Sequence, residues 1–120
     1  MLVLVPSHDD ASRSTQTTIA ASDLLTAIDA GAAPTILDVR SSREFARGRV
    51  PGAINIPFTA ISRRAGEIPS GHDDPLVVYC GHGPRAWIAA RALRARGFHH
   101  LVYLTGHWAG WRRAGLRQER

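Results

Sequence analysis

The strongest constraint on the fold of this chain is a pair of short apolar runs, each followed by a segment with helical features. Residues 35–39 read Thr-Ile-Leu-Asp-Val and residues 75–80 read Pro-Leu-Val-Val-Tyr-Cys, so both contain few polar positions. Runs of this kind are typical of strands that are covered on both faces, as in parallel sheets. They predict a sheet that is buried between two layers of helices.

Shorter strands and helices alternate with these two runs along the rest of the chain. We predict further strands near residues 18–20, 54–56 and 101–104. Helices are predicted between Ser22 and Gly31, between Ser41 and Gly48, and over residues 59–67, 86–96 and 107–114. This alternation, with short loops, predicts an α/β domain with a mostly parallel sheet of about five strands and helices on both faces.

Capping residues predict where several helices begin. Ser22 is expected to be the N-cap of the first helix. Ser41, with Glu44 three residues later, has the pattern of a capping box and predicts the start of the second helix. Pro84 suits the first position of a helix, because the N–H that proline lacks has no partner there. A helix is therefore expected to follow Gly83 directly.

The length of 120 residues fits one domain with a single core. We predict a flexible N-terminal arm at residues 1–17, a globular domain at 18–114 and a basic C-terminal tail at 115–120. No apolar run approaches the roughly 20 residues of a membrane-spanning helix. The apolar opening at residues 1–5 is too short for a signal peptide, so a cytoplasmic location is expected.

The positive charge of the chain is concentrated in its second half. Fifteen arginines and no lysines stand against ten acidic residues, which gives a net charge of +5. Residues 1–60 carry five arginines and six acidic residues, whereas residues 61–120 carry ten and four. Such asymmetry attracts anionic ligands. We do not expect nucleic acid as a partner, because no aromatic-basic binding motif accompanies the charge.

Cys80 is the only cysteine, which excludes an intramolecular disulfide and a multi-cysteine zinc site. It stands at the carboxyl end of its predicted strand, where ligands bind in parallel sheets. The next residues are Gly81-His82-Gly83-Pro84-Arg85, and a helix follows. The glycines allow backbone amides to surround an anion, while the helix dipole and Arg85 add positive potential. These features favour a thiolate, so we predict a nucleophile rather than a buried structural cysteine.

Three motifs, in this order, resemble those of the rhodanese-like domain family, and the resemblance covers about residues 18–113. The first motif comprises residues 38–40 (Asp-Val-Arg), 44–45 (Glu-Phe) and 48–57 (Gly-Arg-Val-Pro-Gly-Ala-Ile-Asn-Ile-Pro). Residues 80–85 match the active-site pattern Cys-x-x-Gly-x-Arg, and Gly106 with Trp108 and Trp111 resembles the terminal motif. The resemblance implies a rhodanese-like three-layer α/β sandwich.

The resemblance also implies an activity, that of a thiosulfate sulfurtransferase without cofactor or metal. Cys80 would take sulfane sulfur from a small anionic donor such as thiosulfate, become a persulfide, and pass the outer sulfur to cyanide or a thiol. A sulfur-accepting protein is a further candidate partner. The implied substrate-binding residues are those of the loop and one arginine of the first motif, namely Gly81, His82, Gly83, Pro84, Arg85 and Arg40.

Several residues leave alternatives open. Arg40 is expected to face the ligand or to pair with Glu44, and His82 to tune the thiol or to face solvent. Arg85 is expected to bind the anionic donor or to brace the loop. His107 replaces the second glycine of the terminal motif, and such departures affect substrate preference. Cys80, His82 and His107 lack a fourth metal ligand, so no metal is expected.

Two other functions compete with sulfur transfer. One is a non-catalytic binding, regulatory or persulfide-carrier module that keeps the fold. The other is a Cdc25-like phosphatase or arsenate reductase, in whose loop five residues separate the cysteine from the arginine. Cys80 and Arg85 enclose four residues. The smaller loop suits a single sulfur atom better than a tetrahedral oxyanion, which favours sulfur transfer.

Overall fold

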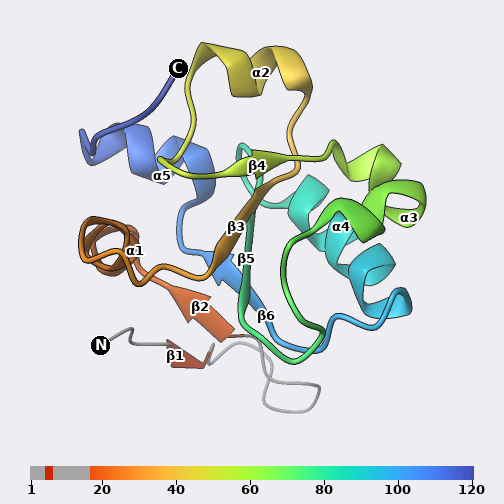
Figure 1. Ribbon diagram of the computed structural model, residues 1–120. Coiled ribbons are helices and arrows are strands. Elements are labelled where there is room, and N and C mark those ends of the chain that lie inside the picture. Colours follow the sequence, from red (N-terminus) through yellow and green to blue (C-terminus); the bar gives the residue numbers. More distant parts are fainter. Residues whose placement is uncertain (1–4, 7–16) are drawn as a thin grey trace.

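The computed structural model describes residues 5–6 and 17–120, in which strands form one twisted sheet (Figure 1). Its order is β1-β2-β6-β5-β3-β4. The strands from β2 to β4 in this order pair in parallel, and β1 pairs antiparallel with β2 at the edge. The mostly parallel sheet is thus confirmed. The strands are β1 (Val5–Pro6), β2 (Thr17–Ile19), β3 (Thr35–Asp38), β4 (Ile54–Asn55), β5 (Leu76–Tyr79) and β6 (Leu101–Leu104).

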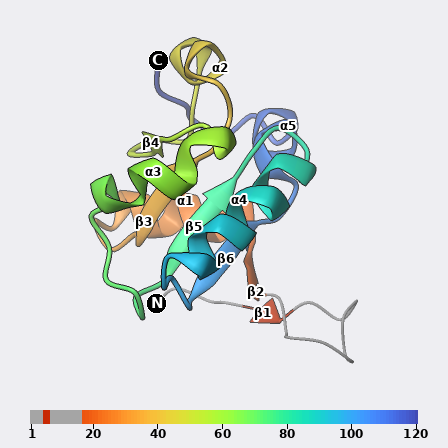
Figure 2. The ribbon, with the colours of Figure 1, turned by 90° about the vertical axis from the view of Figure 1, so that its right-hand side faces the viewer.

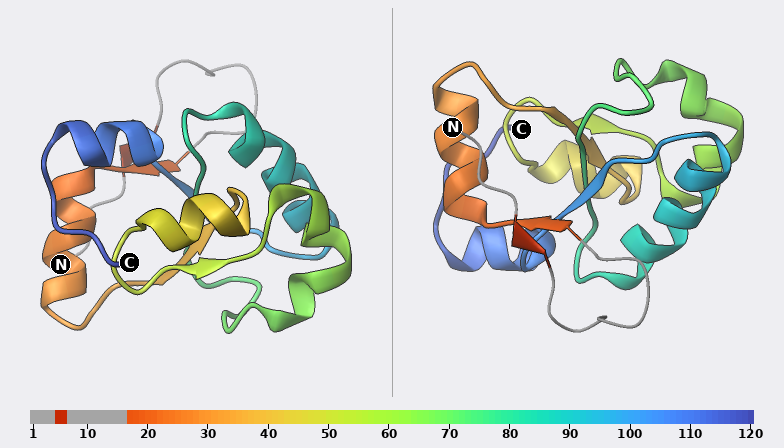
Figure 3. Two further views of the ribbon diagram at one scale, coloured as in Figure 1. Left: turned by 90° about the horizontal axis from the view of Figure 1, so that it is seen from above. Right: turned by 90° about the horizontal axis from the view of Figure 1, so that it is seen from below.

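Helices cover both faces of the sheet, as predicted: Figure 2 looks onto the face that α3 and α4 cover, with α1 behind the sheet. The helices are α1 (Ala21–Asp29), α2 (Ser42–Arg47), α3 (Ile61–Arg64), α4 (Pro84–Ala95) and α5 (His107–Arg113), with 3₁₀ turns η1 (Phe58–Ala60) and η2 (Ala65–Glu67). One buried cluster joins the sheet to α3 and α4, and a second joins it to α1 and α5. Figure 3 shows these two pairs of helices at opposite sides of the molecule.

The register of the two central strands determines where the functional loops meet. Asp38, the last residue of β3, pairs with Tyr79, the last residue of β5. The Val39 N–H donates to the Tyr79 carbonyl at 3.0 Å and continues this pairing. Because the strands are parallel, both chains leave the sheet at the same edge. The segment that leads into α2 therefore lies beside the segment that follows Tyr79.

The predicted helix boundaries are partly confirmed. Ser41 and Glu44 form a capping box, and Pro84 is the first residue of α4. The prediction for Ser22 is wrong: α1 begins at Ala21, and its N-cap Ala20 makes no side-chain hydrogen bond. The Leu24 N–H donates to the Ala20 carbonyl at 3.0 Å, so the helix already includes Ser22 in its first turn. The predicted helix over 59–67 is split into η1, α3 and η2.

Described residues of both predicted terminal segments contact the rest of the domain. The predicted arm at 1–17 includes β1 and Thr17, and its residues 1–4 and 7–16 lie outside the described residues. The predicted tail at 115–120 contacts the domain: Arg49 and Glu119 exchange two backbone hydrogen bonds of 2.9 Å. Arg117 also pairs with Asp29. No helix within residues 5–6 and 17–120 has the length and apolar character needed to cross a membrane.

Candidate active site

Cys80 follows β5 directly and is only 1% exposed. Its Sγ accepts a hydrogen bond from the Gly83 N–H at 2.9 Å, and the backbone amide of Ala86 is a second donor. Both amides belong to the turn that opens α4, so they are among the N–H groups that a helix leaves without internal partners. The loop therefore surrounds the sulfur with donors, as predicted from its glycines.

Gly83 is the glycine whose conformation the loop requires. Its φ is +139°, a backbone geometry that side chains rarely adopt. A Cβ at this position would lie 3.4 Å from Trp87 Cζ2 and 3.5 Å from His107 Nε2. Gly83 thus allows the chain to turn its N–H towards Cys80 while two aromatic side chains approach closely. Any larger residue would be expected to displace the amide that contacts the sulfur.

His107, which the sequence analysis treated only as a departure from the terminal motif, contacts Cys80 directly. It is buried, has a φ of +53°, and comes from the start of α5. Its Nδ1 accepts a hydrogen bond from the Cys80 N–H at 3.2 Å. A ring nitrogen that accepts a hydrogen bond carries no proton, so the proton of the neutral ring lies on Nε2. The imidazole therefore presents an N–H donor to the loop.

These donors act on the ionisation of Cys80. Burial opposes ionisation, but hydrogen bonds from the His107 side chain and from the amides of Ala86 and Gly83 outweigh it and lower the pKa of the thiol to about 7. The thiolate, which is the nucleophilic form of cysteine, is therefore abundant at neutral pH. Its population falls as the pH drops below this value.

The alkylation rate of Cys80 by iodoacetamide is expected to follow this titration, with a midpoint at about pH 7. His107→Gly should move the midpoint upward, because it removes one of the donors to the thiolate, and glycine tolerates the positive φ at this position. Rates measured from pH 5 to 10 by mass spectrometry test this. His107→Ala is the control for the lost imidazole with a Cβ retained. An unchanged midpoint in both variants would mean that the loop amides alone lower the pKa of Cys80.

The guanidinium of Arg85 is paired with the carboxylate of Glu44. Its Nη1 and Nη2 donate to the two carboxylate oxygens of Glu44 at 2.7 and 3.1 Å. This bond, together with capping interactions from Ser41, lowers the pKa of Glu44 to about 2. The Arg85–Glu44 pair ties the start of α4 to α2. The Arg85 hydrogen bonds go to this carboxylate and not to carbonyls of the loop, while the guanidinium contributes positive charge near Cys80.

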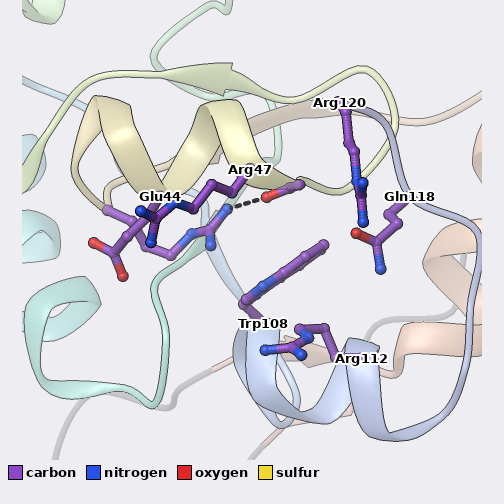
Figure 4. A pocket seen from close by; sticks show the side chains of 8 residues that line it. Glu44, Arg47, Trp108, Arg112, Gln118 and Arg120 are labelled. Carbon is purple, nitrogen blue, oxygen red and sulfur yellow. Dashed lines mark hydrogen bonds between the residues drawn. The ribbon is translucent and has the colours of Figure 1, made fainter.

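Arg40 pairs with Asp38 rather than with Glu44, so the predicted Arg40–Glu44 pair is wrong. Asp38 is fully buried and Arg40 is 3% exposed, and Arg40 Nη2 lies 2.6 Å from Asp38 Oδ2. Asp38 and Arg40 are close together in the chain, and the backbone N–H of Arg40 also donates to Asp38 Oδ1, at 2.8 Å. The guanidinium lies 4.8 Å from the centre of the Trp108 ring. Its Nη2 donates to the Gly48 carbonyl at 2.7 Å (Figure 4).

A cavity of about 400 Å³ lies beside this arginine, between α2, α5 and the C-terminal segment (Figure 4). Glu44 and Trp108 connect its wall to the cysteine loop, since Glu44 binds Arg85 and the Trp108 N–H donates to the Cys80 carbonyl at 2.9 Å. Three arginines of the wall have no ion-pair partner among the described residues. The wall comprises Arg40, Glu44, Arg47, Gly48, Trp108, Arg112, Gln118 and Arg120.

The structure brings most of the predicted site residues together. Gly83 donates to Cys80 Sγ and Arg85 lies near enough to act on its charge, whereas the side chains of His82 and Pro84 are exposed. Arg40 lies in the adjacent cavity wall. Sequence reasoning missed the contact of His107 with Cys80, although a histidine in place of a motif glycine was a signal. Within the described residues, no group of three or more His, Cys, Asp or Glu side chains could hold a metal ion.

Comparisons with known proteins agree with this geometry. The sequence profile of the rhodanese-like domain matches residues 20–114. A sulfurtransferase of Allochromatium vinosum is 35% identical over 81 residues, which are 68% of this chain and 74% of that protein. Thiosulfate sulfurtransferase GlpE of Actinobacillus succinogenes is 33% identical over 86 residues, 70% and 74% of the two chains.

A solved structure shows the same fold. The crystal structure of the Alr3790 protein from Anabaena superposes with a TM-score of 0.74 at 30% sequence identity. The superposition covers 83% of this chain and 89% of that one. The likeness in fold therefore extends over most of both chains.

Proposed function

The chain belongs to the rhodanese-like domain family, and from this premise we propose that it is a sulfurtransferase that carries sulfane sulfur on Cys80. The observation that carries the proposal is the position of Cys80 Sγ, which accepts the Gly83 N–H at 2.9 Å at the start of a helix. Such a position stabilises a negative charge on sulfur. It suits both the attacking thiolate and a persulfide anion.

In the first step, the Cys80 thiolate attacks the outer sulfur of thiosulfate. A new S–S bond forms at Cys80, the S–S bond of thiosulfate breaks, and sulfite leaves with its electron pair. In the second step, cyanide attacks the outer sulfur of the persulfide, and thiocyanate leaves. The electron pair of the broken bond returns to Cys80 Sγ. The His107 side chain and the loop amides stabilise this thiolate in both steps.

The surroundings of the loop favour an anionic donor. The cavity beside it is lined by Arg40, Arg47, Arg112 and Arg120, with Glu44 as the one carboxylate of its wall. Glu44 is already neutralised by Arg85. Arg40 is likewise paired with Asp38, so the positive potential that attracts thiosulfate comes from Arg47, Arg112 and Arg120. We propose that the substrate-binding surroundings of Cys80 comprise the loop residues Gly81, His82, Gly83, Pro84 and Arg85, together with Arg40.

A phosphatase or arsenate reductase is less well supported. A tetrahedral oxyanion requires several donors that are free to bind it, and a guanidinium is well suited to that role. Here both terminal nitrogens of Arg85 are engaged by Glu44. The loop between Cys80 and Arg85 also has only four residues. The shorter loop suits a single sulfur atom, and in sulfur transfer the tetrahedral group of thiosulfate leaves as sulfite, so Arg85 acts on the donor through its charge rather than through free N–H groups.

Incubation with thiosulfate is expected to increase the intact mass of the protein by one sulfur atom. Cyanide should then remove this sulfur with the formation of an equal amount of thiocyanate. The mass of the protein before and after each addition measures both steps, and alkylation of Cys80 beforehand serves as the control. A protein that gains no sulfur from thiosulfate, at any pH between 6 and 9, would contradict the proposed function.

A further inference from the structure

One face of α4 combines exposed apolar and cationic side chains. Trp87 and Ile88 are each 54% exposed and are the exposed large hydrophobic residues of the described part of the chain. Arg91 and Arg94 are also exposed. We call these four residues the α4 face. Large aromatic side chains in water are costly, and they concentrate at sites where proteins bind partners.

The spacing of these residues places them on one side of the helix. Trp87, Arg91 and Arg94 are four and three residues apart, so they form one stripe, with Ile88 beside it. The opposite side of α4 is buried against the sheet through Ala86, Ala89, Ala90 and Leu93. The α4 face is therefore free of the core and cannot be explained by packing of the domain itself.

The α4 face lies next to the cysteine loop at its Trp87 end. The backbone N–H of Trp87 donates to the Gly83 carbonyl at 3.1 Å. In its side chain, Trp87 Cζ2 lies 3.4 Å from the position that a Cβ on Gly83 would take. The Gly83 N–H in turn donates to Cys80 Sγ at 2.9 Å. Gly83 therefore lies between the Trp87 indole and the Cys80 thiol in space. A molecule bound to Trp87 would lie at the entrance of the cysteine loop.

The charge of the α4 face selects the kind of partner. Helix α4 contains no acidic residue, and neither Arg91 nor Arg94 pairs with a carboxylate in the described part of the chain. Arginine and tryptophan are the residues most enriched where binding energy concentrates in protein interfaces. Unpaired cations beside an apolar anchor are complementary to an acidic surface that carries apolar side chains.

We propose that the α4 face docks an acidic protein segment that presents a cysteine thiol to the Cys80 persulfide. The inference rests on the proposed function and names its acceptor. The acceptor thiolate attacks the outer sulfur of the protonated persulfide, and a new S–S bond forms on the acceptor. The S–S bond at Cys80 breaks, its electron pair stays on Sγ as thiolate, and the acceptor leaves as a persulfide.

The test compares three acceptors of the sulfur-loaded protein. Two are synthetic peptides with one cysteine and one leucine, flanked by glutamates in the first and by lysines in the second, and the third is 2-mercaptoethanol. The rate of sulfur loss from the protein is followed by intact mass. The acidic peptide should react at least about 10-fold faster than the basic peptide at low salt, and the difference should shrink as salt screens the charges.

Three variants locate the effect. Arg91→Glu should reduce or reverse the preference for the acidic peptide, whereas Arg113→Glu, with the same change of net charge on α5 across the sheet (Figure 3), should leave it intact. Trp87→Ala should slow the acidic peptide by at least about 5-fold. All three variants should react with 2-mercaptoethanol at the rate of the unmodified sequence, since this small neutral thiol needs no docking surface.

Equal rates for the two peptides, or equal effects of Arg91→Glu and Arg113→Glu, would overturn the proposal. Stronger inhibition of the acidic peptide by a single-stranded oligonucleotide than by an equally charged peptide without cysteine would assign the α4 face to nucleic acid instead. Failure of the proposed function would look different. In that case no sulfur would load onto Cys80, or 2-mercaptoethanol would fail to remove it.

Discussion

Transfer of sulfur from thiosulfate to cyanide is expected to disappear in Cys80→Ser and Cys80→Ala, with a loss of at least about 1,000-fold in kcat/KM. Neither a hydroxyl nor a methyl group can hold the transferred sulfur as a persulfide. Serine fits the space of the thiol, and its oxygen can accept the Gly83 N–H that Cys80 Sγ accepts at 2.9 Å. The Cys80→Ser variant should therefore keep its fold.

Steady-state formation of thiocyanate and a melting curve for each protein test this expectation. The melting temperature of Cys80→Ser should stay close to that of the unmodified sequence, which separates loss of chemistry from loss of fold. Wild-type turnover in either variant would exclude Cys80 as the nucleophile. Retained turnover with a lost mass gain would instead point to transfer without a covalent intermediate.

Asp38→Asn is expected to destabilise the fold by about 3–5 kcal/mol, the largest stability effect that we expect for a single side chain near the site. Asp38 is fully buried, and Arg40 Nη2 lies 2.6 Å from its carboxylate. The amide of asparagine cannot balance the guanidinium charge, so Arg40 is left buried and unpaired. Since domains of this size are stable by about 5–15 kcal/mol, much of the stability would be lost.

Chemical unfolding in urea measures this loss, and two further variants make it interpretable. Glu67→Gln breaks the exposed Arg64–Glu67 pair and should leave the free energy of unfolding almost unchanged, because solvent screens this pair. The double variant Asp38→Leu, Arg40→Met removes both charges and should recover much of the loss. A loss below about 1 kcal/mol in Asp38→Asn would mean that water reaches Arg40 and screens its charge.

The sequence predicted the layers of the fold well because the signals for them are local. The apolar runs that become β3 and β5, the capping box of Ser41 and Glu44, and Pro84 at the start of α4 each depend on residues close together in the chain. Helix boundaries set by the core were harder to predict. Ser22 is a good N-cap by type, but α1 begins one residue before it.

The partners of charged residues could not be predicted in the same way. Arg40 and Glu44 lie four residues apart and suggest a local pair, but the strand register places Arg85 next to Glu44 from 41 residues away. The role of His107 could not be predicted for the same reason, because its contact with Cys80 joins residues that lie 27 positions apart. Such contacts follow from the docking of α5 and α4 onto the sheet, which short sequence patterns do not encode.

The central place of β5 in the sheet has a consequence for how the site comes into being during folding. Leu76 pairs with Thr35 on one side and with Leu101 on the other, so both neighbours of β5 come from distant parts of the chain. Parallel pairing of this kind requires closure of long loops and forms late and cooperatively. No fragment that contains only β5 and α4 would bring Asp38, Glu44 and His107 to the cysteine. Catalytic activity should therefore report the globally folded fraction of the molecules, rather than the local order of one loop.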